Sequence, residues 1–556
     1  MGIVQYILQF IAGLGALLIG LKIFSETIEK LFSKQLSKLF EKTSKNRFAG
    51  VGVGIATSAI LHSSSATTVM VVGLANIGVL PLAAASTIII GANIGTTITA
   101  QITALGTIGG SNSLSISIVL MVLTFIGILI DMIIKNDKVK VIGYSLAGFG
   151  LIFLGLHIMS SSVSGLLSGS ASDVIKNAFS VISNPILLLL IGLLLTAVIQ
   201  SSTAVTTILI SMVAAGLTIG NGGDCVLYII LGTNIGTCAT ALFSSIGTNI
   251  NAKRTSLIHL IFNVSGTVIF TFFLVIWNVI TKTSIMDLTF GKWFSDAPAL
   301  QISMFHTFFN VVTAVIFIPL SNKLVYLVKK IVPDKKDNNR RILSFTDIRL
   351  LSNPTLALNQ VKREIMNLAD INMKTLDSIL SSFFKREFGK EDKVLKEIEE
   401  SYEYANEITD YIIKLTSNEL NESEAKDASQ MHHVIADVLR ISEVSDNVVK
   451  YCRKFEKENL KFSDGVNDEL EVMFNDVKEM FVLTKDAFIN RDTSLLNQID
   501  ELEEKVDEKR TEVLNGHIER LNAGICDYNN VGVFVNIVAN IERIGDHINF
   551  IAHSIE

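Results

Sequence analysis

The apolar and the charged residues of this 556-residue chain lie in different parts of it. Residues 1–321 contain several apolar stretches of roughly twenty residues or more, and about three quarters of the charged side chains follow them. An α-helix needs about 20 predominantly apolar residues to cross the hydrocarbon core of a bilayer. The mean hydropathy of +0.47 is also too high for an ordinary soluble protein. The first part of the chain is therefore predicted to be a polytopic helical membrane domain.

The rest of the chain has the composition of a soluble helical domain. From about residue 345 it is rich in Glu, Lys, Asp, Leu and Ile at helical spacing, and a polar, basic run around Pro333 precedes it. We expect an all-α fold with a membrane domain at 1–328, a linker at 329–344 and a cytoplasmic domain at 345–556. The net charge of −6 gives no sign of a nucleic-acid partner, and the four scattered cysteines predict neither a zinc site nor a disulfide framework.

The membrane half contains an internal duplication that puts polar motifs inside apolar sequence. The first copy has the cluster His62-Ser63-Ser64-Ser65 and, further on, Gly91-Ala92-Asn93-Ile94-Gly95-Thr96-Thr97. The second copy has Gln200-Ser201-Ser202-Thr203 and then Gly232-Thr233-Asn234-Ile235-Gly236-Thr237. Upstream, the glycine-striped segments 13–25 and 148–160 match as well. We predict repeats at about 1–135 and 139–281, followed by an extra helix at about 299–322.

Each repeat is expected to hold a spanning helix, an interfacial amphipathic segment, two shorter helices that meet near the hydroxyl cluster, and two more spanning helices. If the short pair forms a re-entrant hairpin, each repeat crosses the membrane an odd number of times, and the two copies are inverted. Basic residues alternate between loops, since 106–113 and 163–183 are nearly free of Lys and Arg. By the positive-inside rule, this predicts about seven crossings of the plasma membrane, with the N-terminus outside and the C-terminal domain in the cytoplasm.

The duplicated motifs have the chemistry of an anion site beside cation sites. A helix that begins at mid-membrane offers free N–H groups and the positive end of its dipole, which hold an anion when hydroxyl donors line them. Asn and Thr oxygens, together with unwound backbone carbonyls, suit sodium, and glycine allows the backbone to open. Neither motif region contains Lys or Arg. A bound anion is then balanced by helix dipoles and co-bound cations, which links anion transport to sodium.

The paired motifs resemble those of the type II sodium/phosphate cotransporter family, over most of residues 1–325. The resemblance implies sodium-coupled movement of inorganic phosphate, with a substrate site formed by His62, Ser63, Ser64, Ser65, Gln200, Ser201, Ser202 and Thr203. The family's second motif is matched by Asn93, Thr96, Thr97, Asn234 and Thr237, which together with Thr67 and Thr206 are the expected sodium ligands.

Two positions depart from the pattern of that family. Thr203 replaces a serine and keeps the hydroxyl, whereas His62 replaces a glutamine with a group that titrates near physiological pH. One hypothesis is that His62 makes transport pH-dependent. The alternative is a neutral histidine that is hydrogen-bonded within the fold.

The soluble half is duplicated too, because 441–446 aligns with 541–546 and 397–400 aligns with 498–501. This predicts two similar three-helix units. The sequence Glu-Arg-Ile-Gly-Asp-His at 542–547 resembles the PhoU family of helical regulators of phosphate uptake. In metal-binding members, the matching carboxylates hold a divalent or iron-type metal, and here they are Asp507, Glu542 and Asp546. The first copy has Asn406 and Ser442 instead, and the alternative for the carboxylates is a solvated face or pairing with arginines.

The leading interpretation is a phosphate transporter that uses Na+ as coupling ion and carries a PhoU-like domain as a cytoplasmic regulator. One alternative is a membrane-anchored phosphate sensor whose cytoplasmic domain docks a signalling partner, and another is a transporter of a different oxyanion such as sulfate. The sequence contains no nucleophile and base at suitable spacing and no cofactor motif, so nothing in it indicates an enzyme. The oligomeric state is open, with a dimer as one option.

Overall fold

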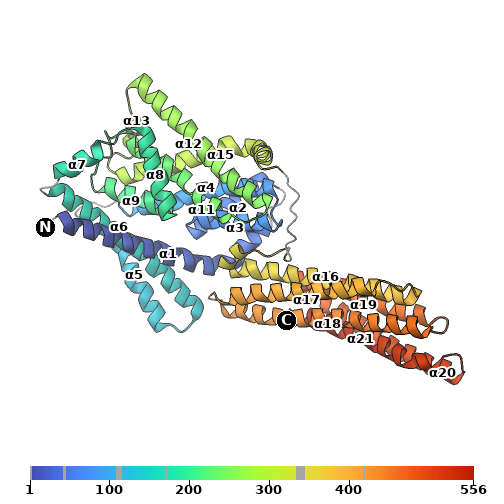
Figure 1. Cartoon of the computed structure of the whole chain (residues 1–556). Helices are drawn as coiled ribbons and strands as arrows, with labels where there is room; N and C mark the ends of the chain where they lie inside the picture. The colour runs from blue at the N-terminus through green and yellow to red at the C-terminus, as the bar shows by residue number, and fades with distance from the viewer. Residues whose placement is uncertain are drawn as a thin grey trace. The chain divides into compact units, whose positions relative to one another are not determined.

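The computed structural model describes residues 3–41, 46–107, 116–169, 172–333, 343, 345–418 and 420–556. Throughout these residues the secondary structure is α-helical, with short 3₁₀ turns and no strand, so the predicted all-α class is confirmed. The chain forms two compact units, Met1–Asn338 and Asn339–Glu556 (Figure 1). Each unit has its own helical packing and is described separately.

The first unit contains the apolar helices, six of which are long and apolar enough to cross a membrane. They are α1 (Ile3–Glu41), α4 (Leu82–Leu105), α6 (Asp137–Ser168), the nearly continuous pair α10 (Cys225–Gly236) and α11 (Cys238–Ser244), α12 (Ile250–Thr281) and α15 (Pro298–Ile331). Helices α7 (Ser172–Ser180) and α8 (Pro185–Ile199) pass the same test together but are bent by 104° between them. The chain is therefore a multi-pass membrane protein, and its described residues contain six or seven candidate spans.

Within the two predicted repeats, the helices differ from the expected elements at two places. Repeat one continues from α1 through α2 (Arg47–Leu61), α3 (Ser64–Asn76) and α4 to α5 (Ile116–Ile133). The segment expected as a separate interfacial element, up to Glu41, is part of α1, because nothing in the sequence breaks the helix before that point. Repeat two runs from α6 to α12 and includes α9 (Ser202–Ala214); the short α13 (Ile285–Leu288) and α14 (Phe290–Trp293) follow it. Helix α15 extends to Ile331, into the segment expected as linker.

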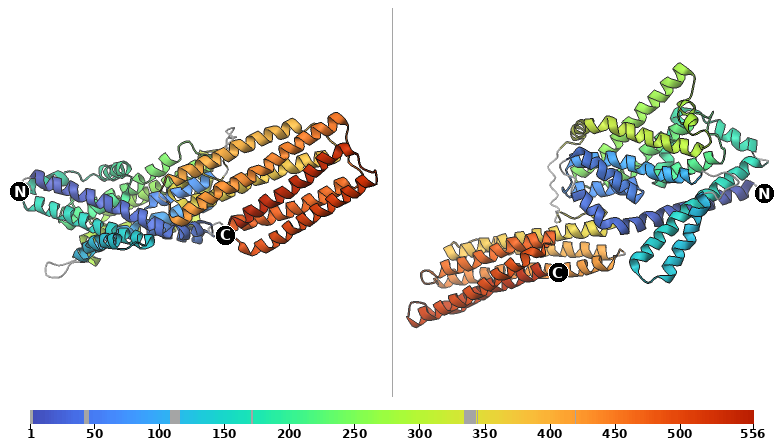
Figure 2. Two further views of the ribbon diagram at one scale, coloured as in Figure 1. Left: turned by 90° about the horizontal axis from the view of Figure 1, so that it is seen from below. Right: turned by 180° about the vertical axis from the view of Figure 1, so that it is seen from behind.

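The first helices of the two repeats, α1 and α6, pack against each other in antiparallel directions (Figures 1 and 2). Their contact is built on glycines. A Cβ added at Gly13 would lie 3.0 Å from the carbonyl oxygen of Gly155, and one added at Gly20 would lie 2.9 Å from that of Gly148. As the residue number rises on α1, the partner's number falls on α6. The glycine stripe that marked the repeat in the sequence therefore allows two backbones to approach closely.

Glycines also join the helix that leads into each hydroxyl cluster to a later helix of the same repeat. A Cβ at Gly54 on α2 would lie 2.0 Å from the carbonyl oxygen of Ile88 on α4, and one at Gly91 would lie 2.1 Å from that of Val51. Gly192 on α8 and Gly232 on α10 form the corresponding contact in repeat two. The expectation that glycine opens the backbone of these motifs is wrong for Gly91, because α4 is continuous through it. The glycines serve close helix packing instead.

The second unit consists of two three-helix bundles (Figure 2). A 3₁₀ turn η1 (Ile348–Ser352) leads into α16 (Pro354–Lys385), α17 (Glu391–Thr416) and α18 (Glu422–Glu458), which pack on one another. The second bundle comprises α19 (Val466–Asn490), α20 (Leu496–Asn522) and α21 (Val531–His553), with the 3₁₀ turns η2 (Thr493–Leu495) and η3 (Tyr528–Asn530) at its connections. Helices α18 and α21 pack against each other and so join the two bundles. All six helices carry buried apolar residues at helical spacing, and these form the faces that pack together.

Candidate functional site

Both hydroxyl clusters lie where one helix ends and the next begins. His62 terminates α2 with φ 50° and ψ 25°, and Gln200 terminates α8 with φ 58° and ψ 23°. This left-handed conformation is uncommon for residues other than glycine and costs about 1 kcal/mol or more. Ser63 and Ser201 follow in extended conformation, with φ −149° and −144°. The two repeats thus share one unusual backbone at the same motif position.

The first serine of each cluster caps the helix that follows. Ser63 Oγ accepts a hydrogen bond from the backbone N–H of Ala66 at 3.1 Å, and Ser201 Oγ accepts one from Ala204 at 3.2 Å. A capping hydroxyl satisfies one of the four N–H groups that an α-helix leaves unpaired at its start. The next hydroxyls in line, those of Ser64 and Ser202, begin α3 and α9 themselves.

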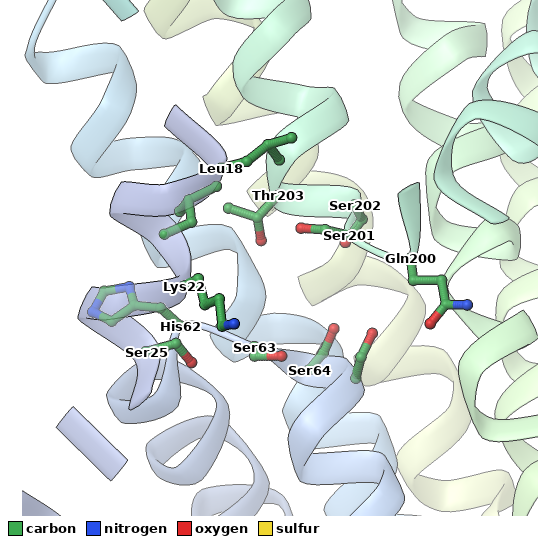
Figure 3. Close-up of a pocket in the computed structure, with 12 residues that line it drawn as sticks. Leu18, Lys22, Ser25, His62, Ser63, Ser64, Gln200, Ser201, Ser202 and Thr203 are labelled. Carbon is green, nitrogen blue, oxygen red and sulfur yellow. The ribbon is translucent and has the colours of Figure 1, made fainter. Parts of the chain in front are cut away.

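The structure brings all eight predicted substrate-site residues around one cavity of about 210 Å³, although the clusters lie 138 positions apart (Figure 3). One wall is formed by the break between α2 and α3 and another by the break between α8 and α9. The N-terminal ends of α3 and α9, each of 13 residues, therefore both reach this cavity. Two positive dipole ends lined with hydroxyls make the cavity suited to an anion.

A third wall comes from α1, which lies outside both hydroxyl motifs. Leu18, Leu21, Lys22 and Ser25 line the cavity from this helix. Ser25 Oγ donates a hydrogen bond of 2.7 Å to the carbonyl oxygen of Leu61, which ties α1 to the end of α2. The absence of Lys and Arg from the motif regions thus does not hold for the cavity, because Lys22 comes from a distant segment. A lysine within an apolar span was the signal in the sequence.

The side chain of His62 is engaged on the side of the cavity that faces α1 and α4. Its Nδ1 lies 2.8 Å from Thr99 Oγ1, and its ring centroid lies 4.7 Å from that of Phe24. This arrangement matches the alternative to the pH hypothesis, a histidine hydrogen-bonded within the fold. Gln200, its counterpart, lines the cavity in the second repeat.

The residues expected to bind sodium do not line this cavity. All seven are buried, and most hydroxyl and amide groups bond to carbonyls of their own helix. The two asparagines behave alike: Asn93 Nδ2 donates a hydrogen bond to the carbonyl oxygen of Ile89, and Asn234 Nδ2 donates one to that of Ile230, both at 2.9 Å. Thr96 also contacts Ser58 across α2 and α4 at 3.2 Å, and Thr206 Oγ1 is buried with no hydrogen-bond partner among the described residues. Their role as sodium ligands therefore stays a prediction.

The three carboxylates predicted to hold a metal in the second bundle lie close enough for their charges to affect one another. Burial and the neighbouring carboxylates raise the pKa of Glu542 and that of Asp546. Arg510 lies 3.6 Å from Glu542, so an arginine partly neutralises the group. Among the described residues, no group of three His, Cys, Asp or Glu side chains is arranged to hold a metal ion. That Asp507, Glu542 and Asp546 hold a metal therefore stays a prediction.

The first bundle has a neutral network at the corresponding place. Ser442, which aligns with Glu542, lies 3.2 Å from Ser401, and Ser401 Oγ donates a hydrogen bond of 2.6 Å to Asn372. Asn372 Nδ2 also donates to the carbonyl oxygen of Val438 at 3.0 Å. Buried hydroxyl and amide groups that satisfy one another leave no charge for a metal to balance.

Comparison with known proteins places the chain in a family. The Na+/Pi-cotransporter family matches it twice in succession, over residues 16–161 and 161–291, and the PhoU domain family matches residues 470–555. The chain therefore belongs to the Na+/Pi-cotransporter family and carries a PhoU domain at its C-terminal end, as the motifs predicted. The double match covers both copies of the hydroxyl motif, and the PhoU match covers the second three-helix bundle.

Relatives cover different parts of the chain. YqeW of Bacillus subtilis is 32% identical over 286 residues, which represent 51% of this chain and 84% of YqeW. The putative inorganic phosphate export protein YjbB of Escherichia coli is 24% identical over 427 residues, 75% of this chain and 74% of YjbB. The sodium-dependent phosphate transport protein 2A of Rattus norvegicus is 36% identical over 94 residues, which represent 17% of this chain and 14% of the rat protein. No solved structure matches the chain.

Proposed function

We propose that this protein transports inorganic phosphate across the plasma membrane, coupled to sodium, and that its PhoU domain regulates this transport from the cytoplasm. The observation that carries the proposal is the single cavity on which both hydroxyl clusters converge. Family membership and the printed names of YjbB and transport protein 2A support phosphate as the substrate.

The cavity supplies the chemistry that a tetrahedral oxyanion needs. The hydroxyls of Ser64, Ser65, Ser202 and Thr203 and the first-turn amides of α3 and α9 offer many donors in a small space. Both helix starts direct positive potential to the same point. In this proposal, Ser63 and Ser201 hold the two helix starts in position, and the other hydroxyls contact the anion.

Sodium coupling is proposed through seven buried oxygen-bearing residues: Thr67, Asn93, Thr96, Thr97, Thr206, Asn234 and Thr237. Carbonyl, amide and hydroxyl oxygens are the usual ligands of coupling ions in secondary transporters. Thr206 Oγ1 supports this, since a buried hydroxyl without a partner is costly unless a ligand or water satisfies it.

Alternating access is proposed to use inverted repeats, with α2–α3 and α8–α9 as re-entrant hairpins that enter from opposite sides. The antiparallel packing of α1 and α6 supports this, because these helices open the two repeats and run in opposite directions. We propose the N-terminus outside, a membrane domain at 1–328, a linker at 329–344, and the domain at 345–556 in the cytoplasm. A dimer and a cytoplasmic signalling partner belong to the same proposal.

Flux measurements on purified protein in proteoliposomes test the function. We expect uptake of radiolabelled phosphate to depend on a sodium gradient and to fall about tenfold or more in Ser64→Ala and in Ser202→Ala, because each removes a donor from the cavity. Ser86→Ala is the matched control, since Ser86 is a buried hydroxyl that bonds to Ala83 in its own helix, away from the cavity.

The competing interpretations give different results in the same vesicles. Binding of phosphate without flux would favour a membrane-anchored sensor. Stronger uptake of sulfate than of phosphate would favour a different oxyanion as substrate. Flux that is equal with and without sodium would contradict the coupling mechanism.

A further inference from the structure

Lys22 alone carries a permanent charge among the described residues that line the cavity. The other lining groups are hydroxyls, amides, a histidine and two leucines. Figure 3 shows the lysine side chain extending from α1 into the space that it shares with Ser63 and Ser64. Lys22 thus provides a cation at the position where both helix N-termini converge.

Lys22 is a largely exposed charged residue within an apolar helix. Lys22 lies inside the apolar span Ile3–Phe32 of α1. Charged side chains within spans face water-filled cavities or partners, because exposure of a charge to lipid costs several kcal/mol. Lys22 Nζ forms a long ion pair with Glu26 at 3.9 Å, which is beyond hydrogen-bonding distance, and the two side chains are 74% and 59% exposed. A pair of this kind leaves the ammonium donors open to a ligand.

The charge belongs to one repeat only. The repeat alignment pairs Ser25 with Ser160, so Lys22 corresponds to His157. Neither Ser160 nor His157 lines the cavity. Ser160 Oγ instead donates to the carbonyl oxygen of Ser211 on α9, whereas Ser25 donates to the end of α2. A packing or folding role that both first helices share does not explain a lysine in only one of them.

We propose that Lys22 binds the transported anion and selects its doubly charged form. This inference rests on the proposed function in that it takes phosphate as the substrate. Each helix N-terminus contributes about half of a positive charge. With the ammonium group, the cavity presents about two positive charges, which match the hydrogen phosphate dianion better than the monoanion. The hydroxyl and amide donors bind either form.

The test measures anion binding to the purified full-length protein by calorimetry, with inorganic phosphate and with sulfate, on both sides of the second pKa of phosphate. The wild-type protein should bind total phosphate more tightly as pH rises, because the fraction of dianion increases. In Lys22→Gln, we expect phosphate and sulfate binding to weaken about ten- to hundredfold, the usual range for a hydrogen bond to a charged group. The pH dependence of phosphate binding should also become flatter.

Two further variants complete the design. Lys22→Arg keeps the charge and should bind phosphate within a few-fold of wild type. Such binding would show that a substitution at this position does not in itself unfold the protein. Lys30→Gln removes an exposed lysine from the same helix outside the cavity and should bind like wild type.

Each result separates this inference from the proposed function. Equal phosphate affinity and equal pH dependence in Lys22→Gln and wild type would overturn the role of Lys22, even if sodium-driven transport is found. Absence of sodium-driven flux in the wild type, with anion binding that depends on Lys22, would overturn the transport proposal alone. A wild-type protein that binds neither phosphate nor sulfate would overturn both.

Discussion

At the scale of residues, the site depends on two left-handed positions that are not glycine. His62 and Gln200 adopt nearly the same φ and ψ, and each turns the chain so that the next serine can cap a helix. Strained conformations of this kind persist where the surrounding fold holds them, and they are common at functional sites. The two positions differ in their side chains: His62 bonds to Thr99, whereas Gln200 lines the cavity without a corresponding threonine contact in its repeat.

This difference gives a prediction for His62. We expect His62→Gln to leave the shape of the pH profile of phosphate transport unchanged, because the imidazole is held by Thr99 and Phe24 and not by the anion. The maximal rate should change by only a few-fold, since glutamine occupies the same left-handed position in repeat two. The measurement is initial uptake across a pH series in proteoliposomes. A profile that loses its pH dependence in this variant alone would restore the hypothesis that His62 is the titrating group.

At the scale of elements, glycine decides how closely helices pack. Gly54 and Gly91 bring α2 and α4 together, and Gly192 and Gly232 do the same for α8 and α10. Helix association within a bilayer depends on close packing of small residues, because lipid is as apolar as a leucine side chain. The helix that ends at each hydroxyl cluster is thereby held against a rigid neighbour, and this fixes the break next to the cavity.

Neighbouring glycines on α2 allow a matched test of this packing. Gly54→Ala should destabilise the protein by about 1–3 kcal/mol, the usual cost of overpacking, because its methyl group would meet the backbone of Ile88. Gly52 has no atom within 4 Å of an added Cβ, so Gly52→Ala should be neutral or stabilise by about 0.5–1 kcal/mol. Thermal unfolding in detergent measures both variants. Equal melting temperatures would contradict the packing role of Gly54.

At the scale of the whole molecule, the chain combines a duplicated membrane unit with a duplicated helical domain. In the membrane unit, the duplication supplies two equivalent helix starts, and these meet at one cavity. In the second unit, only one copy retains the carboxylates of the PhoU pattern, and the other has a neutral hydrogen-bond network. Divergence after duplication thus affected the two units differently.

The inverted arrangement of the membrane repeats predicts the sidedness of two exposed positions. Ala83 lies in the first turn of α4, just after the loop that follows α3, and Thr218 lies in the loop that follows α9, so they mark the open ends of the two proposed hairpins. In a protein whose native cysteines are replaced by serine, we expect Thr218→Cys to react with a membrane-impermeant maleimide from outside intact cells. Ala83→Cys should react only after the membrane is opened. Labelling of both positions from the same side would contradict inversion.

The sequence alone determined the class, the duplications and the candidate substrate residues. Apolar runs of spanning length leave the chain no alternative to membrane helices, and recurring motifs show equivalence without any coordinates. The hydroxyl clusters could be recognised because successive polar residues in an apolar span are costly unless they serve a site. The eight residues predicted in this way all line one cavity.

Only the tertiary structure decided what surrounds those residues. Lys22 and Ser25 reach the cavity because α1 is one long helix that packs beside the α2–α3 break, and no local pattern encodes that contact. The same is true of Gly91, which packs against α2 although its motif suggested an opened backbone. The carboxylates of the second bundle follow a family pattern, but only the tertiary structure shows that Arg510 lies 3.6 Å from Glu542. Periodicity specifies which face of a helix is buried, whereas the partner of that face depends on how distant segments pack.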